Sequence, residues 1–148
     1  MTAKDWVQLI PPAVTAVGVI AAYLTYLVHA RRMRTDSILH IVNRVEQDRQ
    51  NRHVIYGIAN TDSTTWDDSQ RTAADEVCRG FDLVGYFYDE GIVPESLLKD
   101  FYATPVVRCW KKCETFVEHE RKTRQQPSHF YLFEKLAKHC QKLRPDLK

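Results

Sequence analysis

The architecture is decided by residues 6–28, WVQLIPPAVTAVGVIAAYLTYLV, which contain no Asp, Glu, Lys, Arg or His. A helix of this length extends roughly 34 Å, enough to cross a hydrocarbon core of about 30 Å. Pro11 and Pro12 suit its first turn, where a missing N–H removes no intrahelical hydrogen bond. Aromatic residues lie near both ends, as they do at membrane headgroups. The stretch therefore predicts an N-terminal single transmembrane helix.

Basic residues follow this run directly, at Arg31, Arg32 and Arg34, whereas the leader carries Lys4 offset by Asp5. The excess of positive charge predicts that the C-terminal side lies in the cytoplasm and the N-terminus outside. Residues 1–34 are therefore expected to anchor the chain in the cell inner membrane as a single-pass protein. The three arginines are expected to meet the membrane surface, where anionic lipid attracts basic residues.

Two alternatives compete with the membrane helix. Val28, His29 and Ala30 resemble the cleavage site of a signal peptide, but such a peptide has a basic leader and a shorter apolar region. A buried helix of a water-soluble core is the other alternative, and the apolar run is longer than such a helix needs. A membrane anchor is the favoured interpretation.

Charge and cysteine content narrow the classes of function. The formal net charge is +2, from 21 Lys and Arg against 19 Asp and Glu, so there is no strong nucleic-acid signal. Four cysteines lie beyond the apolar run, and in a reducing cytoplasm such residues usually pack as small hydrophobes. No cofactor is expected.

Residues 35–148 are predicted to form a cytoplasmic helical domain, which makes the fold class all-α: a transmembrane helix followed by a small helical bundle. Ile38, Ile41, Val42 and Val45 recur at helical spacing in a helix that runs toward residue 56. Its continuity with the membrane helix is left open, and residues 35–37, Thr-Asp-Ser, are the expected break. Residues 57–67 have the polar composition of a loop.

Further helices are indicated by capping residues and apolar stripes. One begins close to Asp68 and ends near Gly91, and the next starts at Pro94 and is broken or kinked by Pro105. Another follows directly and runs out into the polar residues 118–126. Ser128 is the expected N-cap of the last helix. The expected apolar residues of the last three helices are Leu97, Leu98, Phe101 and Tyr102, then Val106, Cys109, Trp110, Cys113, Phe116 and Val117, then Phe130, Phe133, Leu136, Ala137 and Cys140.

Four stretches carry a family resemblance: EVCRGFDLVG at residues 76–85, GIVP at 91–94, RCW at 108–110 and FYLFEKL at 130–136. With them, the chain resembles the small bacterial membrane-anchored helical proteins that are grouped as a domain of unknown function. The similarity extends from the membrane helix to Leu136. It implies a membrane-anchored helical architecture and supplies no activity and no catalytic residue.

Two sequence patterns are candidates for a functional site, one for metal binding and one for catalysis. Cys109 and Cys113 lie four residues apart on one helix face, and His139 with Cys140 could complete a tetrahedral zinc site. Because these cysteines coincide with apolar stripes, packing in the core is the favoured interpretation.

Arg124 and His129 form an Arg-x4-His element like that of helical ribonucleases, in which His transfers protons and Arg stabilises phosphate charge. Pro127 between them favours solvated loop residues instead.

Two aromatic residues are candidates for partner binding: Trp66 in the polar loop and Tyr131, which lies off the main apolar stripe. The leading hypothesis is a membrane-tethered, noncatalytic interaction or sensor module, and enzymatic activity is not expected. The alternative is a membrane-associated helical ribonuclease that uses Arg124 and His129, and a zinc-dependent sensor is a third possibility. The expected partners are the lipid bilayer and another protein, with homo-oligomerisation left open.

Overall fold

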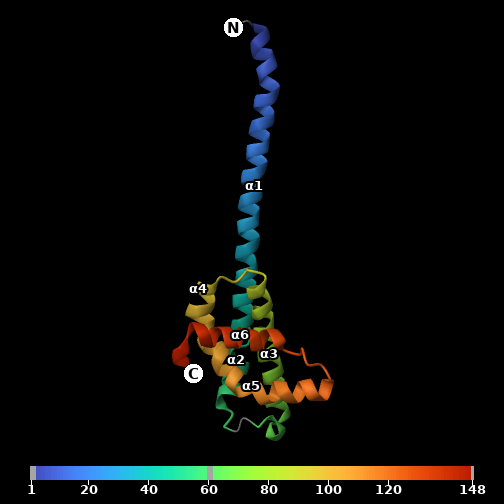
Figure 1. Ribbon diagram of the computed structural model, residues 1–148, viewed down its shortest axis with the longest axis vertical. Coiled ribbons are helices and arrows are strands. Elements are labelled where there is room, and N and C mark those ends of the chain that lie inside the picture. The colour runs from blue at the N-terminus through green and yellow to red at the C-terminus, as the bar shows by residue number, and fades with distance from the viewer. Residues whose placement is uncertain (1–2, 60–61, 148) are drawn as a thin grey trace. The chain divides into compact units, whose positions relative to one another are not determined.

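The computed structural model describes residues 3–59 and 62–147, with the side chains of residues 3–17, 30, 31, 34 and 37 outside the description. Within these ranges every regular element is a helix (Figure 1). The predicted all-helical class is therefore confirmed. The contacts along the chain divide it into two units, Met1–Ser37 and Ile38–Lys148.

The first unit belongs to helix α1, whose full bounds are Ala3–Gln47. Its described side chains in residues 18–28 are mostly apolar, and six large ones are exposed: Val19, Ile20, Tyr23, Leu24, Tyr26 and Val28. In the part of the chain that the structure describes, no helix has both the length and the apolar character needed to cross a bilayer. Residues 6–17 of the expected span lie outside the described side chains, as do Arg31 and Arg34, whereas Arg32 is exposed.

Of the two alternatives left open, the structure has the continuous helix: α1 runs through residues 35–37 without a break and is interrupted only at Asp48, before α2 (Arg49–Gly57). The interruption is short, since the Asp48 N–H still donates to the Arg44 carbonyl at 3.2 Å. The Arg52 guanidinium donates to the carbonyl oxygen of Val45, beside the interruption. Asp48 is buried against Gly80 of helix α3 (Asp68–Asp89), and burial raises the pKa of its carboxyl group. Tertiary packing thus places the break.

Helix α3 (Asp68–Asp89) begins where the capping residues predicted. Asp67 accepts a hydrogen bond from the Gln70 backbone N–H at 2.8 Å, and the Gln70 side chain accepts one from the Asp67 N–H at 3.1 Å. This reciprocal capping box satisfies two donors that the helix itself cannot. The helix ends before Gly91, whose φ of +68° is the left-handed conformation that glycine adopts readily. The expected loop before it contains the short helix η1 (Ser63–Thr65).

Pro105 does not break the chain's helical path. Helix α4 (Glu95–Leu97) leads into a π-helical turn, η2 (Leu98–Tyr102), and then directly into α5 (Ala103–Arg124). Pro105 falls in the first turn of α5, where its missing N–H costs little. Phe101, expected on the apolar side, is instead 70% exposed, while Leu98 and Tyr102 are buried.

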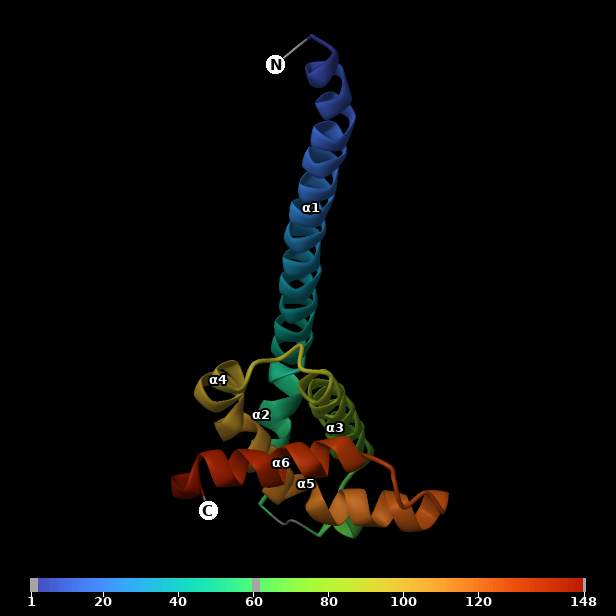
Figure 2. The ribbon, with the colours of Figure 1, turned by 45° about the horizontal axis from the view of Figure 1, so that its top comes forward.

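Helix α6 (Tyr131–Leu143) packs against both α3 and α5 (Figure 2). It is followed by η3 (Pro145–Leu147). The expected N-cap at Ser128 is wrong, because the residue before the helix is Phe130 and no side chain of the preceding loop caps it. Asp82 of α3 accepts a hydrogen bond from the Phe133 N–H at 2.9 Å. A neighbouring helix therefore satisfies part of the first turn of α6.

A single apolar core joins the helices of the second unit. Phe133 is fully buried in it, stacked on Phe81 with ring centroids 5.3 Å apart and edge-on to Trp110 at 5.2 Å. Each large buried side chain of this kind contributes roughly 1.5–3 kcal/mol through removal of apolar surface from water. The expected apolar residues of the last helix are all buried: Phe130, Phe133, Leu136, Ala137 and Cys140.

Candidate functional site

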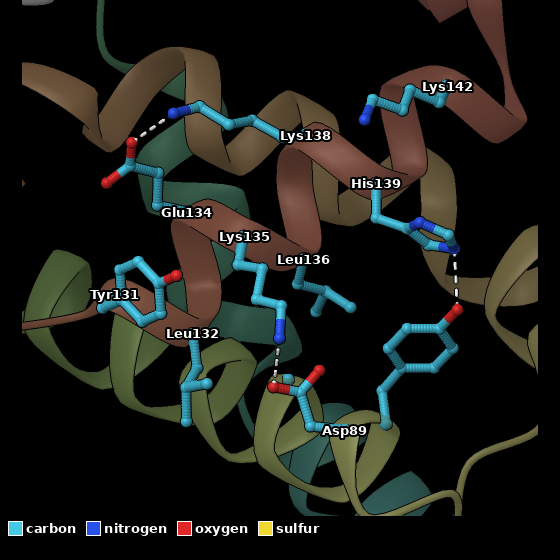
Figure 3. Close-up of a pocket in the computed structure, with 11 residues that line it drawn as sticks. Asp89, Tyr131, Leu132, Glu134, Lys135, Leu136, Lys138, His139 and Lys142 are labelled. Carbon is cyan, nitrogen blue, oxygen red and sulfur yellow. Dashed lines mark hydrogen bonds and ion pairs between the residues drawn. The ribbon is translucent and has the colours of Figure 1, made fainter.

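A cavity of about 340 Å³ opens between α3 and α6 (Figure 3). Its walls come from the last turns of α3 and the outer side of α6. The residues that line it are Gly85, Tyr88 and Asp89 of α3, with Tyr131, Leu132, Glu134, Lys135, Leu136, Lys138, His139 and Lys142 of α6. Apolar side chains and charged side chains meet here, as in most sites that bind small molecules.

The close approach of α3 and α6 depends on Gly85. A Cβ atom at this position would lie 2.7 Å from the Leu132 carbonyl oxygen, which belongs to the backbone and cannot turn away. The absence of a side chain lets the two helices approach here. Together with the bond from Phe133 to Asp82, this contact fixes the start of α6 and hence the wall that carries Tyr131 and Lys135.

Cations around the cavity exceed the carboxylates that balance them. Lys135 Nζ reaches across to Asp89 Oδ2 at 2.6 Å, and Lys138 Nζ lies 2.5 Å from Glu134 Oε1 (Figure 3). Arg121 of α5 also contacts Glu134, at 2.8 Å. Hydrogen bonds from Lys138 and Arg121 hold the pKa of Glu134 below its usual range, so this carboxylate is shared by two cations. Lys142 forms no ion pair with any described residue, and the site carries a positive excess.

A hydrogen-bonded cluster stands at one end of the cavity. The Tyr88 hydroxyl lies 2.7 Å from His139 Nε2, and Glu95 Oε2 of α4 is 3.5 Å from that hydroxyl and 3.7 Å from the imidazole. Burial, and then the neighbouring Glu95, raise the pKa of Tyr88, which therefore keeps its proton at neutral pH. The cluster offers hydrogen-bond donors and acceptors to a ligand.

A wider groove of about 650 Å³ brings together the two residues of the Arg-x4-His element. Arg124 and His129 both line it, with Arg79, Asp82 and Tyr86 from α3. Arg124 Nε is paired with Glu120 at 2.7 Å, and His129 Nε2 is buried with no hydrogen-bond partner among the described residues. Burial, and then the charge of Arg124, lower the pKa of His129, so its imidazole is neutral at pH 7.

The four zinc candidates, Cys109, Cys113, His139 and Cys140, are not gathered into one site. All four cysteines are buried, and burial raises the pKa of the Cys109 and Cys140 thiols to about 12. The Cys109 thiol donates to the Tyr56 hydroxyl at 3.6 Å, while His139 faces Tyr88. Among residues 3–59 and 62–147, no three His, Cys, Asp or Glu side chains are grouped as a metal would require.

The two partner-binding candidates have opposite environments. Trp66 is only 5% exposed and stacks on Phe116 with ring centroids 5.8 Å apart, so it belongs to the core and offers no surface. Tyr131 is 55% exposed at the rim of the cavity. The sequence analysis did not predict this cavity. Its signal in the sequence is the spacing of three and four residues between Lys135, Lys138 and Lys142, on the helix face that also carries Tyr131.

Fold and site together define a small all-helical domain with a basic cavity between two of its helices. Residues 12–140 match the family described as Domain of unknown function (DUF4760), and the chain belongs to that family. The expected membership of an uncharacterised family is confirmed. Comparison with curated proteins and with solved structures found no match.

Proposed function

We propose that this protein is a membrane-tethered binding module of a bacterial inner membrane. Residues 6–28 anchor it, and the helical domain binds a partner or ligand in the cytoplasm through the cavity between α3 and α6. The observation that carries the proposal is the positive excess around this cavity beside the exposed ring of Tyr131. Cations and an exposed aromatic side chain at one hollow favour recognition of another molecule.

The tether is supported by the sequence and by the exposure of α1. Residues 6–28 carry no ionisable Asp, Glu, Lys, Arg or His. Val19, Ile20, Leu24 and Val28 are between 52% and 64% exposed, and large apolar side chains of this kind are stable in lipid but costly in water. Basic residues at 31, 32 and 34 favour a cytoplasmic domain.

Alkaline carbonate extraction tests the tether. The full-length protein should remain in the membrane pellet, whereas a variant without residues 6–28 should be released. Protease added to inside-out vesicles should digest the C-terminal domain, and protease added to intact spheroplasts should spare it. Release of the full-length protein by carbonate would remove the anchor from the proposal.

Site-specific photo-crosslinking in native membranes tests the cavity. A photoreactive amino acid at position 131 should capture a defined partner or ligand, identified by mass spectrometry. The matched control is position 101, because Phe101 is more exposed than Tyr131, at 70% against 55%, yet lines none of the cavities described here. Capture should weaken when Lys138 and Lys142 are replaced by Glu. Equal capture from both positions, or none from position 131, would contradict the proposal.

A ribonuclease is the second candidate function. It is favoured by one observation: Arg124 and His129 line the same groove, and His129 Nε2 has no hydrogen-bond partner among the described residues. A neutral imidazole can accept a proton from a ribose hydroxyl. His129→Ala should then abolish RNA cleavage by the full-length protein, while His119→Ala on α5 should not. Absence of cleavage by the parent protein would eliminate this candidate.

A further inference from the structure

A third hollow lies between α2 and α5. Its volume is about 330 Å³, and it is lined by Tyr56 of α2 with Arg108, Lys111 and Lys112 of α5. No carboxylate lines it. None of the ion pairs among the described residues involves any of these three cations. This differs from the cavity beside α3, where Asp89 and Glu134 balance two of the lysines.

Two of the cations are held in place without being neutralised. The Arg108 guanidinium carbon lies 4.5 Å from the centroid of the Tyr56 ring, a cation–π contact that leaves its N–H groups available. Lys112 Nζ donates to the Ile58 carbonyl at 2.7 Å, which orients the ammonium without cancelling its charge. Tyr56 is itself oriented by the thiol of Cys109. The hollow is therefore preorganised by neutral partners.

Three like charges around one hollow repel one another, and a bound anion would relieve that repulsion. A planar guanidinium and two ammonium groups, at positions three and four residues apart on one helix, supply several donors around the hollow. A phosphate dianion has three acceptor oxygens and nearly two charges, and matches this set better than a carboxylate. We propose that the hollow lined by Tyr56, Arg108, Lys111 and Lys112 binds a phosphate group, supplied by a soluble phosphorylated compound or by a lipid headgroup.

The matched variants are Lys111→Gln and Lys122→Gln. Both lysines are exposed on α5, and each substitution removes one charge, but Lys122 does not line the hollow. Pyrophosphate is titrated into the full-length protein in nonionic detergent, and heat of binding is measured. Lys111→Gln should weaken binding roughly five- to tenfold, as expected for loss of one charge-assisted hydrogen bond. Lys111→Arg should restore most of the affinity, and Lys122→Gln should leave it within about twofold, because screening weakens distant charges.

The source of the phosphate is distinguished by the NMR signal of the Arg108 side-chain N–H. A shift on addition of pyrophosphate in phosphatidylcholine nanodiscs indicates a soluble ligand. A shift on replacing part of the phosphatidylcholine by phosphatidic acid, reversed by pyrophosphate, indicates a lipid headgroup. No shift in either arm overturns the proposal, as does equal weakening by Lys111→Gln and Lys122→Gln, which would show only diffuse attraction. These residues are separate from those of the cavity between α3 and α6, so the two proposals fail independently.

Discussion

At the scale of single residues, Gly85 sets how closely α3 and α6 approach. In Gly85→Ala the new methyl group would meet the Leu132 carbonyl oxygen at 2.7 Å. Because that oxygen belongs to the backbone of α6, the helices must move apart, at a cost of about 1–3 kcal/mol for an overpacked contact. Denaturant unfolding of the full-length protein, followed by circular dichroism, measures the loss.

The control is Gly57→Ala at the end of α2, where a Cβ atom would have no neighbour within 4 Å. That variant should be neutral or more stable by about 0.4–1 kcal/mol, because alanine lowers the entropy of the unfolded chain. If both alanines changed the unfolding free energy alike, the contact at Leu132 would not limit the packing.

His129 should titrate below the ordinary histidine pKa of about 6.5. Burial disfavours the imidazolium, and the guanidinium of Arg124 disfavours it further. Arg124→Gln should therefore raise the pKa of His129, as measured by NMR titration of the imidazole signals. Lys99→Gln removes a charge from η2 and should leave the titration unchanged. A His129 pKa at or above 6.5 in the parent protein would contradict this reading of its surroundings.

The lowered pKa of His129 determines how the unfolding free energy changes with pH. The folded state favours neutral His129, so its contribution is fully present above about pH 6.5 and is lost as pH falls from there through the folded-state pKa. His129→Gln should consequently lose less unfolding free energy than the parent protein when the pH is lowered from 7 to 5. Comparing the two proteins cancels the contributions of the other titrating groups.

Single residues also show where sequence patterns were insufficient. Trp66 stands among polar residues and was expected at the surface, yet it is buried against Phe116. Phe101 fits an apolar stripe but is exposed, because the π-helical turn η2 changes the angular position of successive residues. Helical periodicity assumes regular geometry and local partners, and neither holds at these two positions.

At the scale of helices, Asp82 takes the place of a local N-cap for α6. Its carboxylate accepts the Phe133 N–H at 2.9 Å, while the loop before the helix supplies no capping side chain. Asp82→Ala should lower the unfolding free energy by about 1 kcal/mol, the usual cost of losing a cap. Amide hydrogen exchange at Phe133 should accelerate more than exchange at buried positions of α5.

Asp82→Asn serves as the control, since the amide oxygen can still accept from Phe133 while the negative charge is lost. It should recover most of the stability that Asp82→Ala removes. Equal destabilisation by both variants would mean that charge near the helix terminus matters more than the hydrogen bond.

Helix boundaries could be predicted wherever the stabilising group lies close in sequence. Asp67 and Gln70 mark the start of α3, and Gly91 marks the turn after its end. The start of α6 depends on Asp82, and the interruption at Asp48 depends on contacts with Gly80 and Arg52. Those partners are brought together only by the fold, so local patterns could not identify them.

At the scale of the whole molecule, part of the candidate site could likewise be predicted from nearby residues, and part depends on residues that only the fold brings together. The spacing of Lys135, Lys138 and Lys142 predicts one basic face of a helix, and the exposed position of Tyr131 could be anticipated. The cavity itself requires Asp89 and Tyr88 from α3 to lie opposite that face. The positive excess arises because Lys142 has no ion pair among the described residues. Arg121 of α5 adds to it by sharing Glu134 with Lys138. Because the cavity is lined by residues of both α3 and α6, no single stretch of sequence reveals it.

The division of the chain at residues 37 and 38 predicts which fragment folds without the remainder. Residues 38–148 retain Ile41 and Val45, which are only 1% and 3% exposed in the core, and Asp48 against Gly80. A fragment of residues 49–148 keeps α2 to α6 but loses these contacts. The two aliphatic side chains alone account for roughly 3–6 kcal/mol of burial, a large part of the 5–15 kcal/mol that usually stabilises a domain. The longer fragment should therefore unfold cooperatively in urea, and the shorter one should be largely unfolded or have a much lower midpoint. Equal midpoints would mean that the last turns of α1 do not belong to the core of this domain.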